Sequence, residues 1–377
     1  MKTSINGSIR RCASTFFGPN SHLPLITVRL GALLVAALVP HSGQAESPDA
    51  DQSTRLAGKQ APQNYHLRGV PTRLTTDAAT QGNASIQGRY AAWTQWASEG
   101  SSESDIYLYD LATGVERRIS GPGFQYQATL SNQKLAYTDG SKGDQDDDIM
   151  VYDLGTGETV RLDRPGLQWA PQISGHWMVY NDLRHMNNEV YLCDLRTMTE
   201  SRLTDSPAVQ GGPHISGHRI VWTDFETGAG DIILLDLRTG VVTNLTQHPA
   251  YDGQSGIDGD TVVFVSRRDG GIPNLFYHRL RSGETVQVTQ ASGFGVTDPD
   301  VSGDFISYFE HDPVSNRFNL HVYSVSRGVS APLPDLPTCT GCYRAWNGIS
   351  GNRVIFSDIV DGNQDVYVFT FRFEETH

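Results

Sequence analysis

A short motif recurs along most of this chain at nearly constant spacing. An aliphatic residue is followed two positions later by Gly or Asn and seven positions later by an aromatic residue. The seven copies begin at Ile86, Leu130, Ile173, Ile215, Ile257, Val301 and Ile349. Their mean spacing is about 44 residues, which is the length of one four-stranded propeller blade. Such a repeat constrains the fold strongly, because a single unit cannot bury its hydrophobic faces without its neighbours.

Each unit carries the signals of four short strands. The first strand ends at the aliphatic residue, and the Gly that follows is typical of a tight hairpin turn, which needs positive φ. The second strand contains the aromatic residue. A third, apolar strand opens with an acid or an amide, at Asp105, Asp148, Glu189, Asp231, Asn274, Asn319 and Asp365. A further Gly turn leads to a fourth strand, so the pattern predicts an all-β, seven-bladed β-propeller of four-stranded antiparallel blades.

The order of the strand signals also predicts how the ring closes. The seventh unit stops after its third strand, at Asp365–Phe371, and the Arg-Leu-Thr signature of a fourth strand lies at Arg73–Thr75, ahead of the first unit. We therefore expect an N-terminal strand to complete the last blade, which removes free sheet edges. Residues 71–377 would form one propeller, although chain length alone favours two or three domains.

The first 70 residues differ from the repeats. Leu30–Val39 is an apolar run too short to span a bilayer, and Gly43 and Ala45 are the small residues of a cleavage site. We expect residues 1–45 to be a signal peptide, and a buried helix is the alternative. Residues 46–70 are rich in Ser, Asp, Gln and Pro and are expected to be a disordered leader. The chain would then be periplasmic or secreted, with no transmembrane anchor after signal removal.

Charge and cysteine content exclude several classes of protein. Removing residues 1–45 takes away four of the 29 Lys and Arg and none of the 42 Asp and Glu, which changes the net charge from −13 to −17. A chain this acidic lacks the cationic surface that nucleic acids and anionic membranes require. Four cysteines in 377 residues also exclude a scaffold built from disulfides.

Two of the cysteines, Cys339 and Cys342, lie in the segment that enters the seventh unit. In an oxidising compartment we expect a local disulfide between them. A redox pair and a two-Cys metal site are the alternatives, for which the sequence offers neither a βαβ context nor further ligands. Cys193 replaces the Tyr of other units and is expected to be a buried, small hydrophobic residue.

The consensus of the units resembles the TolB-type propeller repeat. The copy closest to it is Ile215–Asp224, which reads I-S-G-H-R-I-V-W-T-D. The resemblance covers residues 71–371 and implies an exported propeller. The TolB family joins an α/β domain to a six-bladed propeller, whereas this chain has seven units and only a short segment before the first strand. The resemblance therefore implies the architecture and does not carry over the role of TolB.

The strand order predicts two different ends of the ring. The connections between first and second strands and between third and fourth strands are tight Gly turns, and they define the tight-turn face. The other connections are longer and variable, and they define the long-loop face, where we expect the site. Candidate ligand-binding residues in these connections are Trp169, Arg184, His214, Tyr251, Arg267, Asp298, Asp300 and Trp346. Aromatic, His, Arg and Asp side chains around one funnel are typical of glycan or peptide recognition, and internal packing is the alternative for each.

Metal and catalytic candidates are weaker. The acids repeated at strand ends have a structural explanation first, because carboxylates accept backbone N–H bonds in turns. The densest acidic loop offers Asp139, Asp144, Asp146 and Asp148 for Ca²⁺, with a solvated acidic turn as the alternative. No nucleophile elbow, zinc motif or phosphate loop occurs. His214, Asp298 and Arg344 are the candidates for acid–base chemistry.

These observations favour a monomeric, exported propeller that acts as a binding or interaction module through its long-loop face. Its partner would be a protein, a peptide or a glycan. The alternative is a polysaccharide-active enzyme, a lyase or a hydrolase, with its site in the central funnel.

Overall fold

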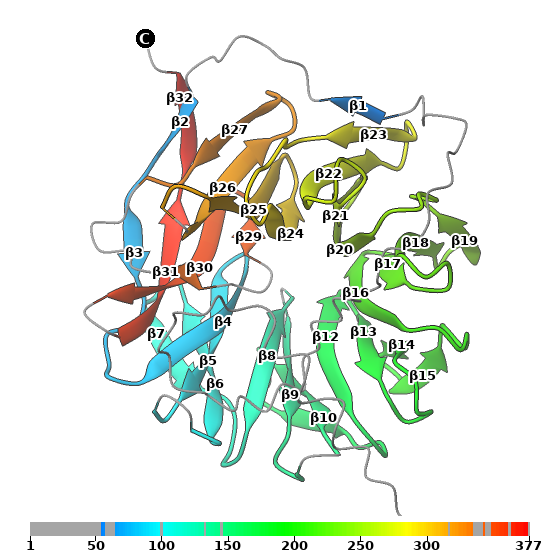
Figure 1. Cartoon of the computed structure of the whole chain (residues 1–377). Coiled ribbons are helices and arrows are strands. Elements are labelled where there is room, and N and C mark those ends of the chain that lie inside the picture. Colours follow the sequence, from blue (N-terminus) through cyan, green and yellow to red (C-terminus); the bar gives the residue numbers. More distant parts are fainter. Residues whose placement is uncertain are drawn as a thin grey trace, which may run out of the picture.

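Seven sheets form a ring around a central axis in the structure, a computed structural model of the chain (Figure 1). The structure describes residues 54–56, 65–98, 101–131, 133–143, 146–315, 317–334, 342–343, 348–360 and 363–375. No helix occurs among them that is long and apolar enough to cross a membrane. The all-β, seven-bladed propeller predicted from the repeat is confirmed.

Each blade is an antiparallel meander whose first strand lies nearest the axis. Blade 1 comprises β4 (Thr80–Gln87), β5 (Tyr90–Trp96), β6 (Ser104–Asp110) and β7 (Val115–Arg118). Blade 2 comprises β8 (Gln125–Leu130), β9 (Lys134–Asp139), β10 (Asp148–Asp153) and β11 (Thr159–Leu162). Blade 3 comprises β12 (Gln168–Ser174), β13 (Trp177–Asp182), β14 (Glu189–Asp194) and β15 (Thr199–Arg202). Blade 4 comprises β16 (Gln210–Ser216), β17 (Arg219–Asp224), β18 (Asp231–Asp236) and β19 (Val241–Asn244). Blade 5 comprises β20 (Asp252–Asp258), β21 (Thr261–Ser266), β22 (Asn274–Arg279) and β23 (Glu284–Gln287). Blade 6 comprises β24 (Val296–Ser302), β25 (Phe305–Asp312), β26 (Arg317–Ser324) and β27 (Val329–Pro332). Blade 7 comprises β28 (Cys342–Tyr343) and β29 (Ile349–Ser350), which both pair with β30 (Arg353–Val360), then β31 (Asn363–Thr370) and β3 (Pro71–Arg73).

The ring closes as the sequence predicts, because β3 pairs antiparallel with β31 and supplies the fourth strand of blade 7. The buried Asp365 carboxylate accepts hydrogen bonds from Thr75 Oγ1 at 3.0 Å and from Arg73 at 2.5 Å. Thr75 Oγ1 also accepts the backbone N–H of Val366 at 2.9 Å. The same arrangement occurs inside blade 4, where Thr246 bonds to Asp231 and to the N–H of Ile232. The closure therefore uses the bonds that hold an ordinary third and fourth strand together.

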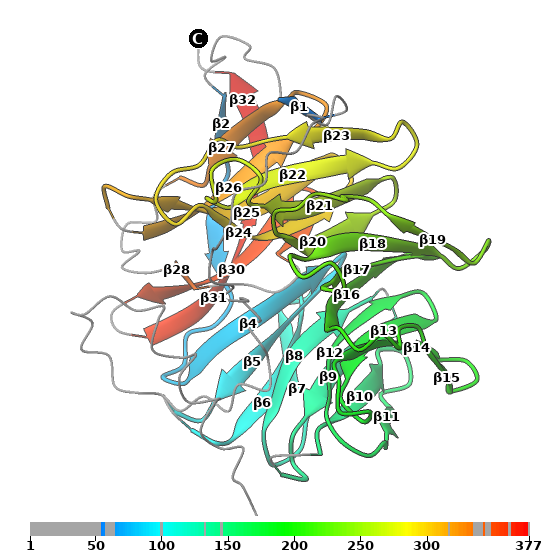
Figure 2. The ribbon, with the colours of Figure 1, turned by 45° about the vertical axis from the view of Figure 1, so that its right-hand side comes forward.

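Two further strands lie in the segment that was expected to be a disordered leader. β1 (Thr54–Leu56) adds a parallel strand to the outer edge of blade 5, and β2 (Tyr65–Arg68) pairs with β32 (Arg372–Glu375) beside β27 (Figure 2). In β2 the alternating Leu67 is buried against the core of blades 6 and 7. The backbone pairing and this burial give the segment structure that its polar composition does not reveal. Residues 1–53 lie outside the described residues.

The hydrophobic core is divided into layers between neighbouring blades. Trp93 of blade 1 is fully buried and packs in one cluster with Ile355 and Val366 of blade 7. Cys193 is buried in the cluster between blades 2 and 3, as its place in the repeat predicts. Both faces of each sheet are covered in this way, so each blade depends on its neighbours for burial.

The Gly of the repeat motif links neighbouring blades at five of the seven interfaces, as seen among the described residues. The Gly takes positive φ, from +54° at Gly88 to +61° at Gly217. The N–H of this Gly donates to a Ser or Asp side-chain oxygen of the preceding blade. The acceptor residue stands directly before the Gly of that blade's own motif. These inter-blade bonds are Gly217 to Ser174 at 2.8 Å, Gly259 to Ser216 at 3.0 Å, Gly303 to Asp258 at 2.7 Å, Gly351 to Ser302 at 2.9 Å and Gly88 to Ser350 at 3.0 Å. The motif is therefore both a turn and a bond between blades.

We expect Gly303→Ala to lower the free energy of unfolding by about 1–2 kcal/mol, because an L-residue is strained at this φ. A Cβ at this position would meet nothing within 4 Å, so strain and not a clash is the cause. Gly303→Asn should cost less, since Asn tolerates the left-handed region and Asn132 stands at this position in blade 2. Urea unfolding measures both variants, and equal losses for Ala and Asn would contradict the assignment.

We expect Thr75→Val to lower the free energy of unfolding by about 1–3 kcal/mol, because it leaves the buried Asp365 and the Val366 N–H each short of a partner. Thr246→Val removes the same bonds within blade 4 and is the matched control. Only Thr75→Val should also expose the N-terminal strand to limited proteolysis. Equal protease sensitivity of the two variants would show that closure is not the weak point of the ring.

Candidate functional site

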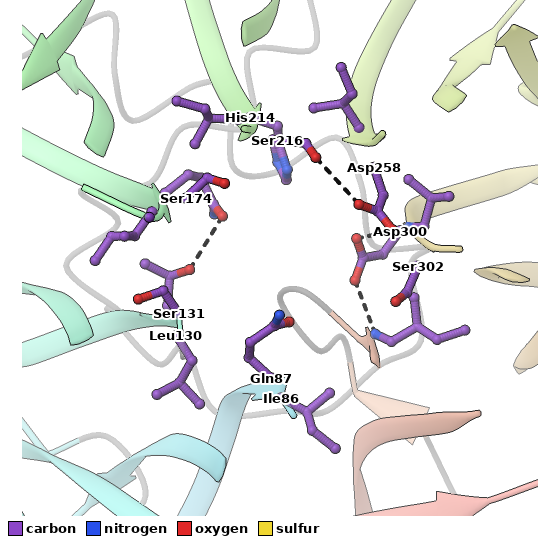
Figure 3. Close-up of a pocket in the computed structure, with 18 of the residues that line it drawn as sticks. Ile86, Gln87, Leu130, Ser131, Ser174, His214, Ser216, Asp258, Asp300 and Ser302 are labelled. Carbon is purple, nitrogen blue, oxygen red and sulfur yellow. Dashed lines mark hydrogen bonds between the residues drawn. The ribbon is translucent and has the colours of Figure 1, made fainter. Parts of the chain in front are cut away.

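The first strands of the blades surround a polar cavity on the axis. Figure 1 shows β4, β8, β12, β16, β20, β24 and β29 around the centre of the ring. The cavity has a volume of about 400 Å³ and lies at the tight-turn end, where these strands finish. Polar lining residues include Gln87, Ser131, Ser174, His214, Ser216, Asp258, Asp300 and Ser302 (Figure 3). A volume of this size is typical of small-molecule sites.

A β-bulge interrupts the first strand in six of the blades. In six blades the residue three positions before the motif has positive φ, at Asn83, Gln127, Ala170, Gly212, Gln254 and Asp298. The register of the first strand shifts at the same point in each of these blades. Gln254 Oε1 accepts the N–H of Asp298 at 3.0 Å, and Gln127 Oε1 accepts that of Ala170 at 3.0 Å. The bulge thus forms a second set of bonds between blades.

His214 and Asp300 occupy the same position of the repeat, directly before the motif, in blades 4 and 6. Both side chains line the cavity and are half-buried, because the cavity keeps some contact with solvent while protein surrounds them. Burial lowers the pKa of His214 to about 4, so its imidazole is neutral near pH 7. No described residue donates to or accepts from the His214 ring by a hydrogen bond.

The Asp300 carboxylate is held by the backbone of two blades. Its oxygens accept the N–H of Val301 at 2.9 Å and of Ile349 at 3.0 Å. Burial raises the pKa of Asp300 to about 6, although these two hydrogen bonds oppose the shift. Asp258 of blade 5 adds a second negative charge to the same side of the cavity and raises the pKa of Asp300 further.

These positions differ from the predicted ones. His214, Asp298 and Asp300 were expected in loops of the long-loop face, but they lie within β16 and β24. His214 and Asp300 face the cavity at the opposite end of the ring. The length of the first strands explains the difference. β16 begins at Gln210 and β24 at Val296, so a residue directly before the motif lies near the tight-turn end of its strand and not in the loop before it.

The remaining described candidates separate into two groups. Trp169 lies in β12 and is buried. Tyr251 and Arg267 lie together on the long-loop face, with the Arg267 guanidinium 5.5 Å from the centre of the Tyr251 ring. Burial raises the pKa of Tyr251. Arg267 is exposed, so this pair is open to a partner on that face.

Arg184 lies in a network of buried charges. Its guanidinium bonds to Asp182 and Glu200 and lies 4.5 Å from the centre of the Tyr191 ring. Burial alone would raise the pKa of Glu200, but hydrogen bonds from Tyr180, Arg164 and Arg184 lower it. These contacts of Arg184 are internal to blade 3. The network holds the strands and connections of that blade together.

Several predicted residues lie outside the described residues. These are Arg344, Trp346, Asp144 and Cys339, and only the backbone of Cys342 is described, in β28. The disulfide between Cys339 and Cys342 therefore stays a prediction, as do the contributions of Arg344 and Trp346 to a site.

Two cations of the chain itself, Lys142 and Arg161, pair with carboxylates of the acidic loop after β9. Lys142 Nζ lies 2.8 Å from Asp148 and 3.8 Å from Asp146, and Arg161 bonds to both Asp148 and Asp139. The Asp139 carboxylate also accepts the N–H of Ser141 at 3.1 Å, which fixes the turn. Among the described residues no group of three or more His, Cys, Asp or Glu is placed to hold a metal ion.

Sequence reasoning missed the most exposed apolar side chains of the long-loop face. Phe294 is 69% exposed, and Val314 and Met186 are each 94% exposed. Phe294 lies in the connection from β23 to β24, and Val314 lies in the connection from β25 to β26. Single Phe and Val residues in variable loops give no sequence signal, because only the fold shows which loops lie side by side.

No family model matches the chain, and no curated protein matches it. Several solved structures are similar to the chain in fold. An oligogalacturonate lyase in complex with manganese shares 16% identity over 81% of this chain and 93% of its own, with a TM-score of 0.60. The β-propeller domain of the Trilobed protease from Pyrococcus furiosus, described as having an open velcro topology, shares 10% identity over 79% and 98%, with a TM-score of 0.60. TolB from Acinetobacter baumannii shares 18% identity over 81% and 79%, with a TM-score of 0.45. The first two similarities agree with the propeller fold that the seven four-stranded blades show, and the likeness of the units to the TolB-type repeat remains a resemblance in sequence.

Proposed function

We propose that this chain is an exported binding module that holds a protein partner on its long-loop face. The observation that carries the proposal is the blade 6 patch, which consists of Phe294, Pro313 and Val314. All three residues are exposed. A Cβ on Gly293 would lie 3.4 Å from Pro313 Cβ, so the two loops that carry the patch are in contact. Contiguous apolar surface of this kind is typical of protein interaction sites.

The surroundings of the patch suit a protein segment. Arg267 and Tyr251 lie on the next loops, and Arg and aromatic residues are enriched among the residues that contribute most to protein binding. The loop after β23 reaches the loop before β22, because the N–H of Val296 donates to the carbonyl of Pro273 at 3.0 Å. Phe294, Arg267 and Tyr251 thus belong to adjoining loops of blades 5 and 6.

The patch is supported from below. The ring of Phe294 lies 4.5 Å from that of His311, centre to centre, and the Phe294 N–H donates to His311 Nδ1 at 3.2 Å. His311 is buried and packs against Phe318 of β26. A loop fixed before binding loses less conformational entropy when a partner binds, which favours affinity.

The enzyme alternative, a polysaccharide lyase or hydrolase in the funnel, has less support. Acid–base catalysis requires groups within hydrogen-bond reach of the reacting proton. Within the described part of the chain, no residue bonds to the His214 ring, and the cationic candidate Arg344 lies outside the described residues. The similarity to an oligogalacturonate lyase supports the propeller fold and not the activity.

Selection of a phage-displayed library of random peptides on the mature protein tests the proposal. We expect enriched peptides whose binding falls at least about tenfold on Phe294→Asp or Val314→Asp, because a charge in the contact would have to lose its water. Val241→Asp is the matched control, since Val241 is 56% exposed on β19, away from the long-loop face.

Three results would contradict this function. Peptides that bind the Phe294→Asp variant unchanged would place the site elsewhere. Binding on a glycan array without any enriched peptide would change the class of partner. Turnover of a polysaccharide that His214→Ala abolishes would favour the enzyme.

Export is part of the proposal and has its own test. The small residues before Glu46 and the acidic propeller that follows suit cleavage after Ala45. Expression of the full chain in a bacterial host should give a periplasmic or secreted monomer that begins at Glu46 by N-terminal sequencing. A cytoplasmic product that retains Leu30–Val39 would contradict export by this signal.

A further inference from the structure

The cavity at the tight-turn end has an uneven distribution of charge. Its lining contains two carboxylates, Asp258 and Asp300, and no Lys or Arg among the described residues. Both carboxylates and His214 lie on the side formed by blades 4 to 6 (Figure 3). Blades 1 to 3 contribute neutral side chains, including Gln87, Ser131 and Ser174. A ligand on the charged side would therefore meet a negative potential.

Blade 5 places its carboxylate differently from its neighbours. The position that holds His214 in blade 4 and Asp300 in blade 6 holds Gly256 in blade 5. A Cβ on Gly256 would lie 3.2 Å from Val263 Cγ2 and 3.6 Å from the carbonyl oxygen of Pro299, so this position is already packed. Asp258, two residues further along β20, is the charged side chain that blade 5 contributes to the cavity.

The charged groups on this wall of the cavity are hydrogen-bond acceptors. The two oxygens of Asp258 accept Ser216 Oγ at 3.3 Å and the Gly303 N–H at 2.7 Å. The two oxygens of Asp300 accept one backbone N–H each. Each carboxylate oxygen has a second lone pair, and a neutral imidazole has one acceptor nitrogen. The wall therefore suits a cation that carries several N–H donors.

We propose that this cavity binds a small organic molecule with a primary ammonium group and several hydroxyl groups. The ammonium lies against the wall that carries Asp258 and Asp300, His214 faces the same ligand, and the hydroxyl groups face Gln87, Ser131 and Ser174. An ammonium has three donors for these acceptors. The low pKa of His214 agrees with this arrangement, since a protonated imidazole would repel the ligand. The site is independent of the proposed partner surface, which lies on the other face.

Calorimetry with three matched sugars tests the proposal. Glucosamine is cationic near pH 7, whereas glucose lacks the nitrogen and N-acetylglucosamine lacks the charge. We expect the mature protein to bind glucosamine at least about tenfold more tightly than either neutral sugar. Equal binding of all three, or no binding of glucosamine, would overturn the proposal and leave a water-filled channel.

Two variants locate the site. Asp300→Asn removes one charge but keeps an oxygen for a backbone N–H, and it should weaken glucosamine binding at least about tenfold. Asp304→Asn removes a charge from the same end of blade 6 outside the cavity and is the control. Unchanged binding to Asp300→Asn, or equal losses in the two variants, would overturn the assignment.

A second measurement serves if Asp300→Asn unfolds. The ¹⁵N resonances of the His214 ring should shift when glucosamine is added to the wild-type protein and should not shift with glucose. A His214 ring that does not respond to glucosamine would overturn the proposal.

Discussion

Packing of each sheet against the next is the interaction on which this propeller depends. A blade with both faces apolar has no complete core of its own, so its burial comes from two neighbours. The ring must then close, because the seventh blade would otherwise leave a face and an edge open. The bonds among Arg73, Thr75 and Asp365 close the ring between two segments that are far apart in the sequence. Thr75 and Asp365 are separated by 290 positions.

The ring geometry also determines where functional chemistry can lie. Seven first strands around one axis leave a channel, and the side chains that point to it face one another across a cavity of about 400 Å³. Five bonds between successive blades, from a Gly N–H to a Ser or Asp oxygen, fix the tight-turn end of this channel. Each is expected to contribute about 1 kcal/mol. The connections on the other face make none of these bonds and are free to differ from blade to blade, which suits recognition of a partner.

The repeat predicted the architecture because its signals are local. The period gave the number of blades, and the missing fourth strand of the seventh unit gave the closure. The site was predicted less well. His214 and Asp300 were placed at the wrong end of the ring, because the first strands begin earlier than the turn signals indicate, at Gln210 in β16 and at Val296 in β24. The partners of Arg184 include Glu200, which is sixteen residues away, so its burial in a charge network follows only from the pairing of strands.

The cavity and the blade 6 patch are joined by one strand, since β24 begins just after Phe294 and contains Asp300. This continuity does not by itself couple the two sites. Coupling requires an element with two arrangements whose equilibrium both ligands shift. β24 is held at its start by the bond from Val296 to Pro273, in its middle by the bond from Asp298 to Gln254, and beyond its end by the bond from Gly303 to Asp258. A strand fixed at three points along its length favours one arrangement, so the two ends of the propeller are expected to bind their ligands independently.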